Sequence, residues 1–359
     1  MKRILVLLIA LFFVLPTPVK AYSAASYALY DPLTDRVLAQ RNMDTRRGMA
    51  STTKLMTALV AAERYDPDKT IKIDKTWCGI EGSSIYLQPG ESVTIRELLY
   101  GLLLCSGNDA ATALAGLGGN PAGFVARMNE RAVELSMLNT HFDNPSGLDG
   151  DTHYSTAYDL CLLAQAVLEV PLLRQIVGTR SAHIGGRWMT NHNRLLAYNG
   201  IIGLKTGYTK TCGRCLVSAM EQNGRTLIAV TLGDPDDWND HLALYETAFE
   251  GMERRNLVEA GAHWRTAVAG IGTCNLYVNE RFELSLLAEE LNAVTVRLRG
   301  PRLCYPNICA GEQWGTLRVE LNGSLLFETA VYFESDFAAP QPGFWERMWQ
   351  NLMHNRSQK

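Results

Sequence analysis

The chain has 359 residues, 47% of them hydrophobic, which is enough for two ordinary domains with their own cores. Lysine and arginine number 34 against 37 acidic residues, a formal net charge of −3. This balance has no basic excess, so nucleic acid is not an expected partner.

The first 21 residues have the pattern of a secretory signal peptide. The basic segment MKR precedes the apolar run ILVLLIALFFVL, and Val19 and Ala21 occupy the −3 and −1 positions of a cleavage site. Cleavage after Ala21 removes Lys2, Arg3 and Lys20, so the net charge falls from −3 to −6. We therefore expect an exported protein; the alternative is an uncleaved N-terminal anchor.

The next region, residues 22–252, combines strands at both ends with helices between them. Residues 26–42 have the pattern of a β-hairpin, and Thr94 with Glu97 forms a capping box at the start of a helix. Three strand-like runs follow from residue 201, and a two-residue Asn-Gly turn joins the last two. These patterns predict an α/β domain with a mainly antiparallel sheet.

Beyond residue 252 the pattern is β only. Five short strand-like runs are separated by Gly, Pro and Asn residues, at 273–280, 282–287, 293–300, 315–321 and 325–333. They predict a small β domain over residues 253–335. A linker is expected at 336–343.

Eight cysteines remain after cleavage, and their spacing does not indicate a dense disulfide framework. The CxxC at 212–215 has no second CxxC or histidine pair beside it, so a zinc or redox role is not predicted. Cys304 and Cys309 flank a turn-like stretch and are the best disulfide candidates. No H-E-x-x-H or comparable ligand set occurs, and neither a metal nor a cofactor is expected.

Ser51 and Lys54 stand three positions apart at the start of an apolar helical stripe. A serine hydroxyl needs a base within reach, and helical positions i and i+3 share a face. A lysine acts as that base only if burial or a neighbouring cation lowers its pKa. The S-x-x-K pattern alone is weak, because such a tetrapeptide is expected by chance in a chain of this length.

Two further motifs strengthen this pattern. SGN at 106–108 lies at a break between two predicted helices, and KTG at 205–207 lies on a predicted strand. Taken alone, SGN could simply be a polar turn, and Lys205 of KTG could be a solvated cation on a strand. In this order, however, the three motifs match the signature of serine enzymes that recognise β-lactams, with Gly107 where that signature has Asp.

On these residues the chain resembles the D-alanyl-D-alanine carboxypeptidases, low-molecular-mass penicillin-binding proteins of serine peptidase family S11. That family typically carries the SGN form. The likeness extends over roughly residues 22–340, and its further stretches are 98–111, 145–160, 203–219 and 301–323. The resemblance implies a β-lactamase/transpeptidase-like domain, an antiparallel sheet with a helical subdomain, followed by a small C-terminal all-β domain.

The resemblance also implies catalytic roles. Ser51 would attack the carbonyl between two D-alanines and form an acyl-enzyme. Lys54 would be its general base, and Ser106 would relay a proton to the departing nitrogen. The expected substrates are peptidoglycan stem peptides ending in D-Ala-D-Ala, in the cell-wall space at the outer face of the cytoplasmic membrane. The expected covalent inhibitors are β-lactams.

Substrate-binding roles follow from the same resemblance. Asn108 would hold the substrate amide and contact Lys54, while Lys205 would lower the proton affinity of Lys54 and attract the terminal carboxylate. Thr206 would bind that carboxylate, and Gly207 would leave room for the substrate beside the strand. The N–H groups of Ser51 and Tyr208 would form the oxyanion hole.

The segment at 191–196, NHNRLL, offers two further candidates for contact with the substrate carboxylate, His192 and Arg194. The sequence does not decide between them. His153 is interpreted as a structural hydrogen-bonding residue. One alternative function is a β-lactamase, but ELSMLN at 134–139 has one residue too many for that class's E-x-x-L-N. The other is a catalytically weak wall-binding protein that keeps the scaffold.

The last 16 residues, 344–359, have an apolar stripe at helical spacing and polar residues elsewhere. The segment is too short and too polar to span a bilayer, but its two tryptophans beside basic residues suit a membrane interface. The sequence therefore predicts an amphipathic helix that binds the membrane surface. The alternative is a helix packed on the β domain or on a partner subunit.

Overall fold

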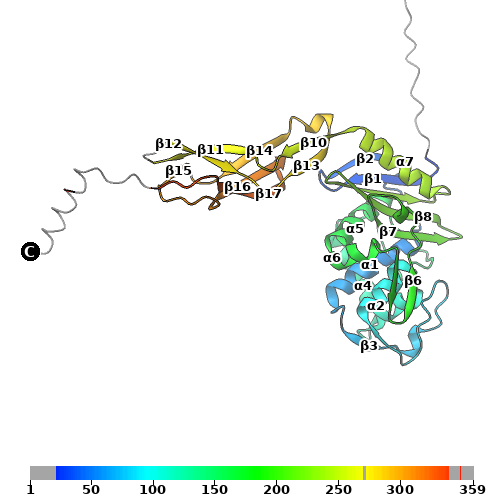
Figure 1. The fold of residues 1–359 in the computed structure, drawn as a ribbon. Helices are drawn as coiled ribbons and strands as arrows, with labels where there is room; N and C mark the ends of the chain where they lie inside the picture. The colour runs from blue at the N-terminus through cyan, green and yellow to red at the C-terminus, as the bar shows by residue number, and fades with distance from the viewer. Residues whose placement is uncertain (1–21, 270–271, 339–347, 349–359) are drawn as a thin grey trace, which may run out of the picture. The chain divides into compact units, whose positions relative to one another are not determined.

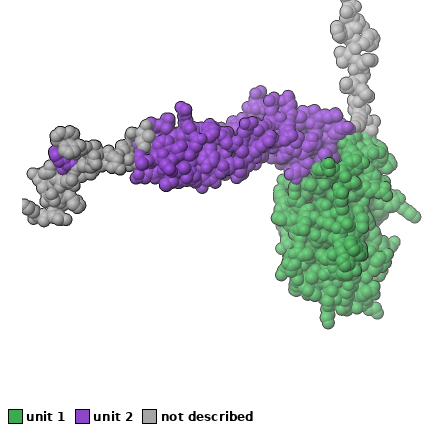
Figure 2. Space-filling view, viewed as in Figure 1, with its two compact units in different colours: residues 1–30, 37–219, 228–244 green, residues 31–36, 220–227, 245–359 purple. Residues whose placement is uncertain are grey.

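The structure, a computed structural model, describes residues 22–269, 272–338 and 348. The chain divides into two compact units of discontinuous segments (Figure 2). Unit 1 comprises residues 1–30, 37–219 and 228–244, and unit 2 comprises residues 31–36, 220–227 and 245–359. The predicted signal peptide and, apart from Met348, the predicted tail helix lie outside the described residues. The predicted boundary after residue 252 stays a prediction.

A five-stranded sheet has the order β2-β1-β9-β8-β7 (Figure 1). Its strands are β1 (Ser26–Asp31), β2 (Arg36–Arg41), β7 (Ile201–Thr209), β8 (Gly213–Gln222) and β9 (Arg225–Leu232). The predicted hairpin and the three later strands thus join one sheet, in which β1 pairs antiparallel with β9. Asn223 and Gly224, between β8 and β9, both have positive φ, as the predicted tight turn requires.

Capping side chains fix where several helices begin. Thr94 accepts a hydrogen bond from the N–H of Glu97 (3.1 Å), and Thr156 accepts one from Asp159 (3.0 Å). Asn120 caps the helix that opens with a proline. The helices are α1 (Lys54–Arg64), α2 (Ile95–Leu104), α3 (Asn108–Gly116), α4 (Pro121–Glu134), α5 (Ala157–Glu169), α6 (Pro171–Val177) and α7 (Asp237–Glu250).

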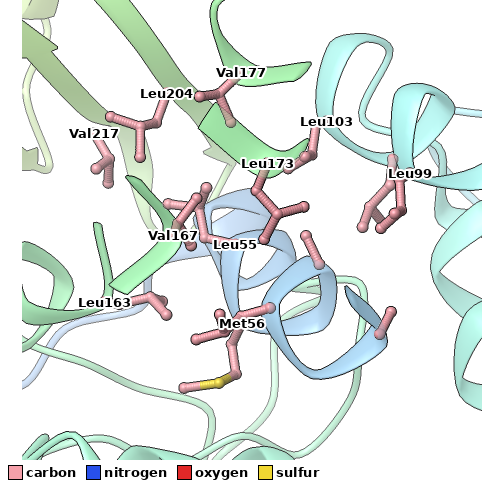
Figure 3. Packing of buried hydrophobic residues seen from close by; sticks show 14 of the residues in the cluster. Leu55, Met56, Leu99, Leu103, Leu163, Val167, Leu173, Val177, Leu204 and Val217 are labelled. Carbon is pink, nitrogen blue, oxygen red and sulfur yellow. The ribbon is translucent and has the colours of Figure 1, made fainter. Parts of the chain in front are cut away.

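The main core lies around α1, whose Leu55 and Met56 are fully buried. Figure 3 shows them among side chains of α2, α5, α6 and the strands β7 and β8. The opposite face of the sheet carries α7, because buried His241 contacts Ser218 of β8 (2.7 Å) and Thr231 of β9 (3.1 Å). Helices therefore cover both faces of this sheet.

Two short hairpins complete unit 1. One pairs β3 (Thr70–Lys72) with β4 (Ser92–Thr94), and the other pairs β5 (Ser181–Ile184) with β6 (Arg187–Thr190). The β5–β6 hairpin, strands β3 and β4, and helix α6 were not among the predicted elements.

Unit 2 consists mainly of β-strands, as the sequence predicted for its C-terminal part. A six-stranded sheet has the order β14-β16-β17-β12-β11-β15, and β10 pairs with β13 in a second, two-stranded sheet. The strands are β10 (Met252–Val258), β11 (His263–Val268), β12 (Gly272–Tyr277), β13 (Phe282–Leu287), β14 (Val294–Arg299), β15 (Leu303–Cys304), β16 (Gln313–Leu321) and β17 (Ser324–Phe333). Strands β10, β11 and β15 were not predicted.

The proposed disulfide between Cys304 and Cys309 is wrong for this structure, in which both are free cysteines. Cys304 is buried on β15, where its carbonyl accepts a hydrogen bond from Ala269. Cys309 is exposed. Cys304 is therefore in the interior of unit 2 and Cys309 at its surface.

Candidate active site

Ser51 lies in a short 3₁₀ helix, η1 (Ala50–Thr53), and not in the first turn of α1 as expected. The hydroxyls of Thr52 and Thr53 donate to the carbonyls of Met49 and Ala50 at 2.7 and 2.8 Å. Ala50 has φ of 48°, a left-handed conformation that costs a non-glycine residue free energy. The turn is therefore fixed by its own side chains in a conformation that the local sequence does not favour.

His153 supports this turn from outside. Its Nδ1 accepts a hydrogen bond from the N–H of Asp143 (3.0 Å), which leaves the proton on Nε2, 2.8 Å from Thr53 Oγ1. Burial lowers the pKa of His153 to about 4, so the ring is neutral at ordinary pH. The predicted structural role matches these contacts.

Lys54 is fully buried beneath Ser51. Its Nζ lies 3.0 Å from Ser51 Oγ and also donates a short hydrogen bond to the carbonyl of Ser146. Burial, reinforced by the Lys205 cation and opposed by Asp109, holds the pKa of Lys54 well below its ordinary value. A neutral amine within reach of the hydroxyl is what a general base requires.

Lys205, on β7, is the second buried lysine of the site. It is 1% exposed, and its Nζ donates to the carbonyl of Thr206 at 2.8 Å. Burial lowers the pKa of Lys205 to about 7, against a small opposing effect of Cys105. Lys205 therefore changes its charge close to neutral pH.

The SGN motif forms the break between α2 and α3. Ser106 has φ of 61° and is 5% exposed, and Asn108 begins α3. The side-chain amide of Asn108 donates to the carbonyl of Glu81 at 2.5 Å. Among the described residues it makes no hydrogen bond with Lys54, the contact that the sequence predicted. The break thus fixes Asn108 against the loop that follows η2 (Lys75–Trp77), since its backbone N–H also donates to the carbonyl of Ser83 at 2.7 Å.

Two glycines allow the backbone to pack tightly around Ser51. A Cβ on Gly207 would lie 3.0 Å from the Ser51 nitrogen and 3.1 Å from the Met49 carbonyl. A Cβ on Gly147, which has φ of 87°, would lie only 2.0 Å from the Ala50 carbonyl. Strand β7 therefore runs directly beside the turn that holds Ser51, and only glycine fits at Gly207 without displacing that turn.

A cleft of about 380 Å³ opens above these groups. Five predicted site residues line it: Ser51, Ser106, Thr206, Gly207 and Tyr208. The other three, Lys54, Asn108 and Lys205, are buried. Both candidates from the 191–196 segment, His192 and Arg194, also line the cleft, so the structure brings the three motifs and this segment together.

Arg214 is a cleft residue that the sequence analysis missed. Its guanidinium is 2.5 Å from the buried Asp237 carboxylate and lies 5.3 Å from the ring centroid of Trp238. Both partners line the cleft as well. The Nε of Arg214 is buried and has no hydrogen-bond acceptor among the described residues. The sequence places Arg214 in the CxxC segment and the other two after β9, so no local pattern connects them.

Asp109 was also missed, although it directly follows SGN. Its buried carboxylate accepts hydrogen bonds from the Ser84 hydroxyl (2.6 Å) and from the N–H groups of Ile85 and Leu87 (3.1 Å each). It thereby fixes the loop that contributes Ser83 to the cleft. An acidic residue in the first turn of a helix was the available signal. The described residues contain no cluster of three or more His, Cys, Asp or Glu side chains suited to a metal ion.

Comparison with known proteins decides the family. The model of the D-alanyl-D-alanine carboxypeptidase family, Peptidase S11, matches residues 15–236. The chain belongs to this family. The D-alanyl-D-alanine carboxypeptidase DacF of Bacillus subtilis (strain 168) is 32% identical over 335 residues, which is 88% of this chain and 86% of that protein. DacC of Escherichia coli (strain K12) is 29% identical over 359 residues, 92% and 88% of the two chains.

Solved structures agree with this family. Penicillin binding protein 6B from Escherichia coli matches with a TM-score of 0.65 and 25% identity, covering 88% of this chain and 96% of that one. The D-alanyl-D-alanine carboxypeptidase from Mycobacterium tuberculosis H37Rv matches with a TM-score of 0.63 and 35% identity, covering 65% and 94%. These matches confirm the resemblance, the β-lactamase/transpeptidase-like fold with a C-terminal β domain, and the prediction of a serine-type D-Ala-D-Ala carboxypeptidase.

Proposed function

We propose that this carboxypeptidase removes the terminal D-alanine from peptidoglycan stem peptides through an acyl-enzyme on Ser51, and that β-lactams acylate the same residue. The observation that carries the proposal is the pair of Ser51 Oγ and Lys54 Nζ, 3.0 Å apart at the floor of the cleft. The buried amine has a depressed pKa, so it accepts the serine proton as the oxygen attacks.

Acylation breaks the peptide bond between the two D-alanines and leaves the shortened peptide bonded to Ser51. Lys54 takes the proton from Ser51, whose oxygen bonds to the carbonyl carbon between the two D-alanines. The N–H groups of Ser51 and Tyr208 stabilise the oxyanion; the close approach of strand β7 to the Ser51 turn, where a Cβ on Gly207 would lie 3.0 Å from the Ser51 nitrogen, supports this role. The proton passes through Ser106 to the departing nitrogen, and water later releases the shortened peptide from Ser51.

The substrate carboxylate binds, in this proposal, at Thr206 and the arginines that line the cleft. Burial and the Lys205 cation lower the pKa of His192, so its ring is mostly uncharged at neutral pH. The arginines are therefore the better candidates for binding the carboxylate. Arg214 is held in place by Asp237 and Trp238, and 39% of its side-chain surface remains exposed for a carboxylate to approach. Asn108 would hold the substrate amide.

Labelled penicillin and a peptide ending in D-Ala-D-Ala test the proposal together. We expect the unchanged chain to form a long-lived covalent adduct and to release one D-alanine per peptide, measured by mass spectrometry. Ser51→Ala should lose both activities and keep the thermal unfolding profile. Full labelling of Ser51→Ala would contradict the assignment. Rapid turnover of the adduct would indicate a β-lactamase, and absence of any adduct a wall-binding protein.

We also propose export and attachment to the membrane surface through residues 344–359. The leader pattern and the apolar stripe of the tail support this proposal. No single helix of the described residues has the length and apolar character needed to cross a membrane. The full chain is expected to fractionate with membranes, and a chain ending at residue 340 to become soluble with unchanged penicillin labelling. Retention of the shortened chain on membranes would contradict a tail anchor.

A further inference from the structure

A second cleft, of about 570 Å³, lies in unit 2 and is lined by residues of β11, the end of β14, the segment after β14 and the start of β16. We name it the arginine cleft, because three of its lining residues are arginines and none is acidic. Arg265 comes from β11, Arg299 ends β14, and Arg302 precedes β15. Segments distant in the sequence thus bring three like charges to one concave surface.

These three arginines differ from the other arginines of the same sheets. Arg265, Arg299 and Arg302 have no ion pair among the described residues, although all three are exposed. By contrast, Arg254, Arg255, Arg281, Arg297 and Arg318 each pair with a glutamate. An unpaired cluster of guanidinium groups keeps its positive charge available for an anion from outside.

One wall of the arginine cleft is Trp314. Its ring lies flat on the backbone of Gly300, where an added Cβ would come within 2.8 Å of three ring atoms. The indole Nε1 is buried and lacks a hydrogen-bond acceptor in the described part of the chain. Because this N–H is enclosed, Trp314 presents its indole ring to the cleft, and the arginines supply the donors that an anion would reach.

Arg302, which lines the arginine cleft, directly precedes β15. Ile308, five residues after β15 begins, bridges to Phe337, one residue before the last continuous described position. Leu303 and Tyr305 are exposed here, at 50% and 77%. The last continuous described residues therefore lie beside the segment that follows Arg302 and carries exposed Leu303 and Tyr305.

We propose that the arginine cleft binds the phosphate groups of anionic phospholipids at the membrane surface. Guanidinium groups bind phosphate oxygens in bidentate geometry, and aromatic and apolar side chains beside basic ones suit the headgroup region. A soluble phosphate would use the arginines but would gain nothing from exposed Leu303 and Tyr305. The observations therefore favour a lipid surface over a dissolved anion.

The arginine cleft would act as a second membrane contact beside the tail. Each basic residue near an anionic surface raises affinity by roughly a factor of five, so three arginines alone bind weakly. Stable attachment commonly needs two signals, and an amphipathic segment with a basic patch is one such combination. The inference rests on the membrane attachment proposed above but not on the chemistry of Ser51.

Vesicle binding by the full mature chain tests the inference, with neutral phosphatidylcholine vesicles and vesicles containing roughly one-third phosphatidylglycerol. The test variant carries Arg265→Gln, Arg299→Gln and Arg302→Gln. A matched control carries Arg254→Gln, Arg255→Gln and Arg281→Gln, which removes the same charge from the same unit. We expect the test variant to lose on the order of 100-fold in affinity for anionic vesicles, and the control only a few-fold. Neutral vesicles should bind all three proteins equally.

A second variant and a competitor sharpen the result. Trp314→Phe keeps a ring on Gly300 but removes the N–H, and should lower anionic binding less than the triple variant does. Penicillin labelling and thermal unfolding confirm that each variant is folded. Equal losses in the test and control variants would overturn the inference and leave the tail proposal standing. Full displacement from vesicles by about 10 mM inorganic phosphate would identify a soluble-anion site and also overturn it. No vesicle binding by the unchanged chain would contradict both proposals.

Discussion

At the scale of single residues, the proposed mechanism makes two buried lysines responsible for the pH dependence of acylation. If neutral Lys54 is the base, as proposed, the acylation rate falls as pH drops through the pKa of Lys54. The Lys205 cation lowers that pKa, and Lys205 itself has a pKa of about 7. Lys205→Met removes the cation, so the pKa of Lys54 rises. We predict that the acidic limb of the acylation rate moves to higher pH and that the maximal rate falls by orders of magnitude.

The pH profile of penicillin acylation measures this shift. Lys210→Met removes an exposed lysine just beyond β7 and should leave the profile in place. A movement of the limb toward lower pH in Lys205→Met would contradict electrostatic coupling of the two lysines. The two groups are expected to titrate as a pair, so the limb reports the pair and not either lysine alone.

At the same scale, the sequence predicted those residues whose chemistry depends on local spacing. Ser51 and Lys54 meet because they are three positions apart on one turn, and KTG meets them because its glycine fits beside that turn. Arg214, Asp237 and Trp238 meet only when β8 and the start of α7 come together, and such a pairing depends on the folded sheet. A single sequence carries no signal for it.

At the scale of elements, capping residues and hydrophobic periodicity predicted most of unit 1. Thr94, Asn120 and Thr156 each accept the hydrogen bond that their position implies. The sequence predicts an α-helix at Ser51 where the structure has a 3₁₀ helix, because residues i and i+3 lie on one side in both kinds of helix. The chain departs from an α-helix here because Ala50 has positive φ. Gly147 and Gly207 pack closely against Ala50 in this conformation.

Other elements were missed for identifiable reasons. The β5–β6 hairpin turns at Gly185 and Gly186, which both have positive φ, so the Gly-Gly pair was a usable turn signal. Strand β10 exposes four consecutive residues, Glu253–Asn256, and therefore lacks the alternation that identifies a half-buried strand. Strand β15 has only two residues and pairs parallel with β11, which no local pattern predicts.

At the scale of the whole molecule, each unit has its own stabilising centre, and that of unit 2 includes a buried charge network. Arg225 is fully buried and donates to both oxygens of Glu290, at 2.6 and 2.8 Å, and to the carbonyl of Ser285 at 2.9 Å. It also makes a short hydrogen bond to buried Asp31. One cation thus compensates two carboxylates that would otherwise be buried without a partner.

We predict that Arg225→Met lowers the free energy of unfolding of unit 2 by about 3–5 kcal/mol, because it leaves Asp31 and Glu290 buried without their counter-charge. Chemical denaturation measures the loss of unfolding free energy, and calorimetry provides a second measurement. Arg255→Met is the matched control, because Arg255 pairs with exposed Glu253 at 2.5 Å, away from the buried network, and should change stability little. A triple variant that also carries Asp31→Asn and Glu290→Gln should recover part of the loss, since it removes the unpaired charges. Equal effects of Arg225→Met and Arg255→Met would show that the buried network does not hold unit 2 together.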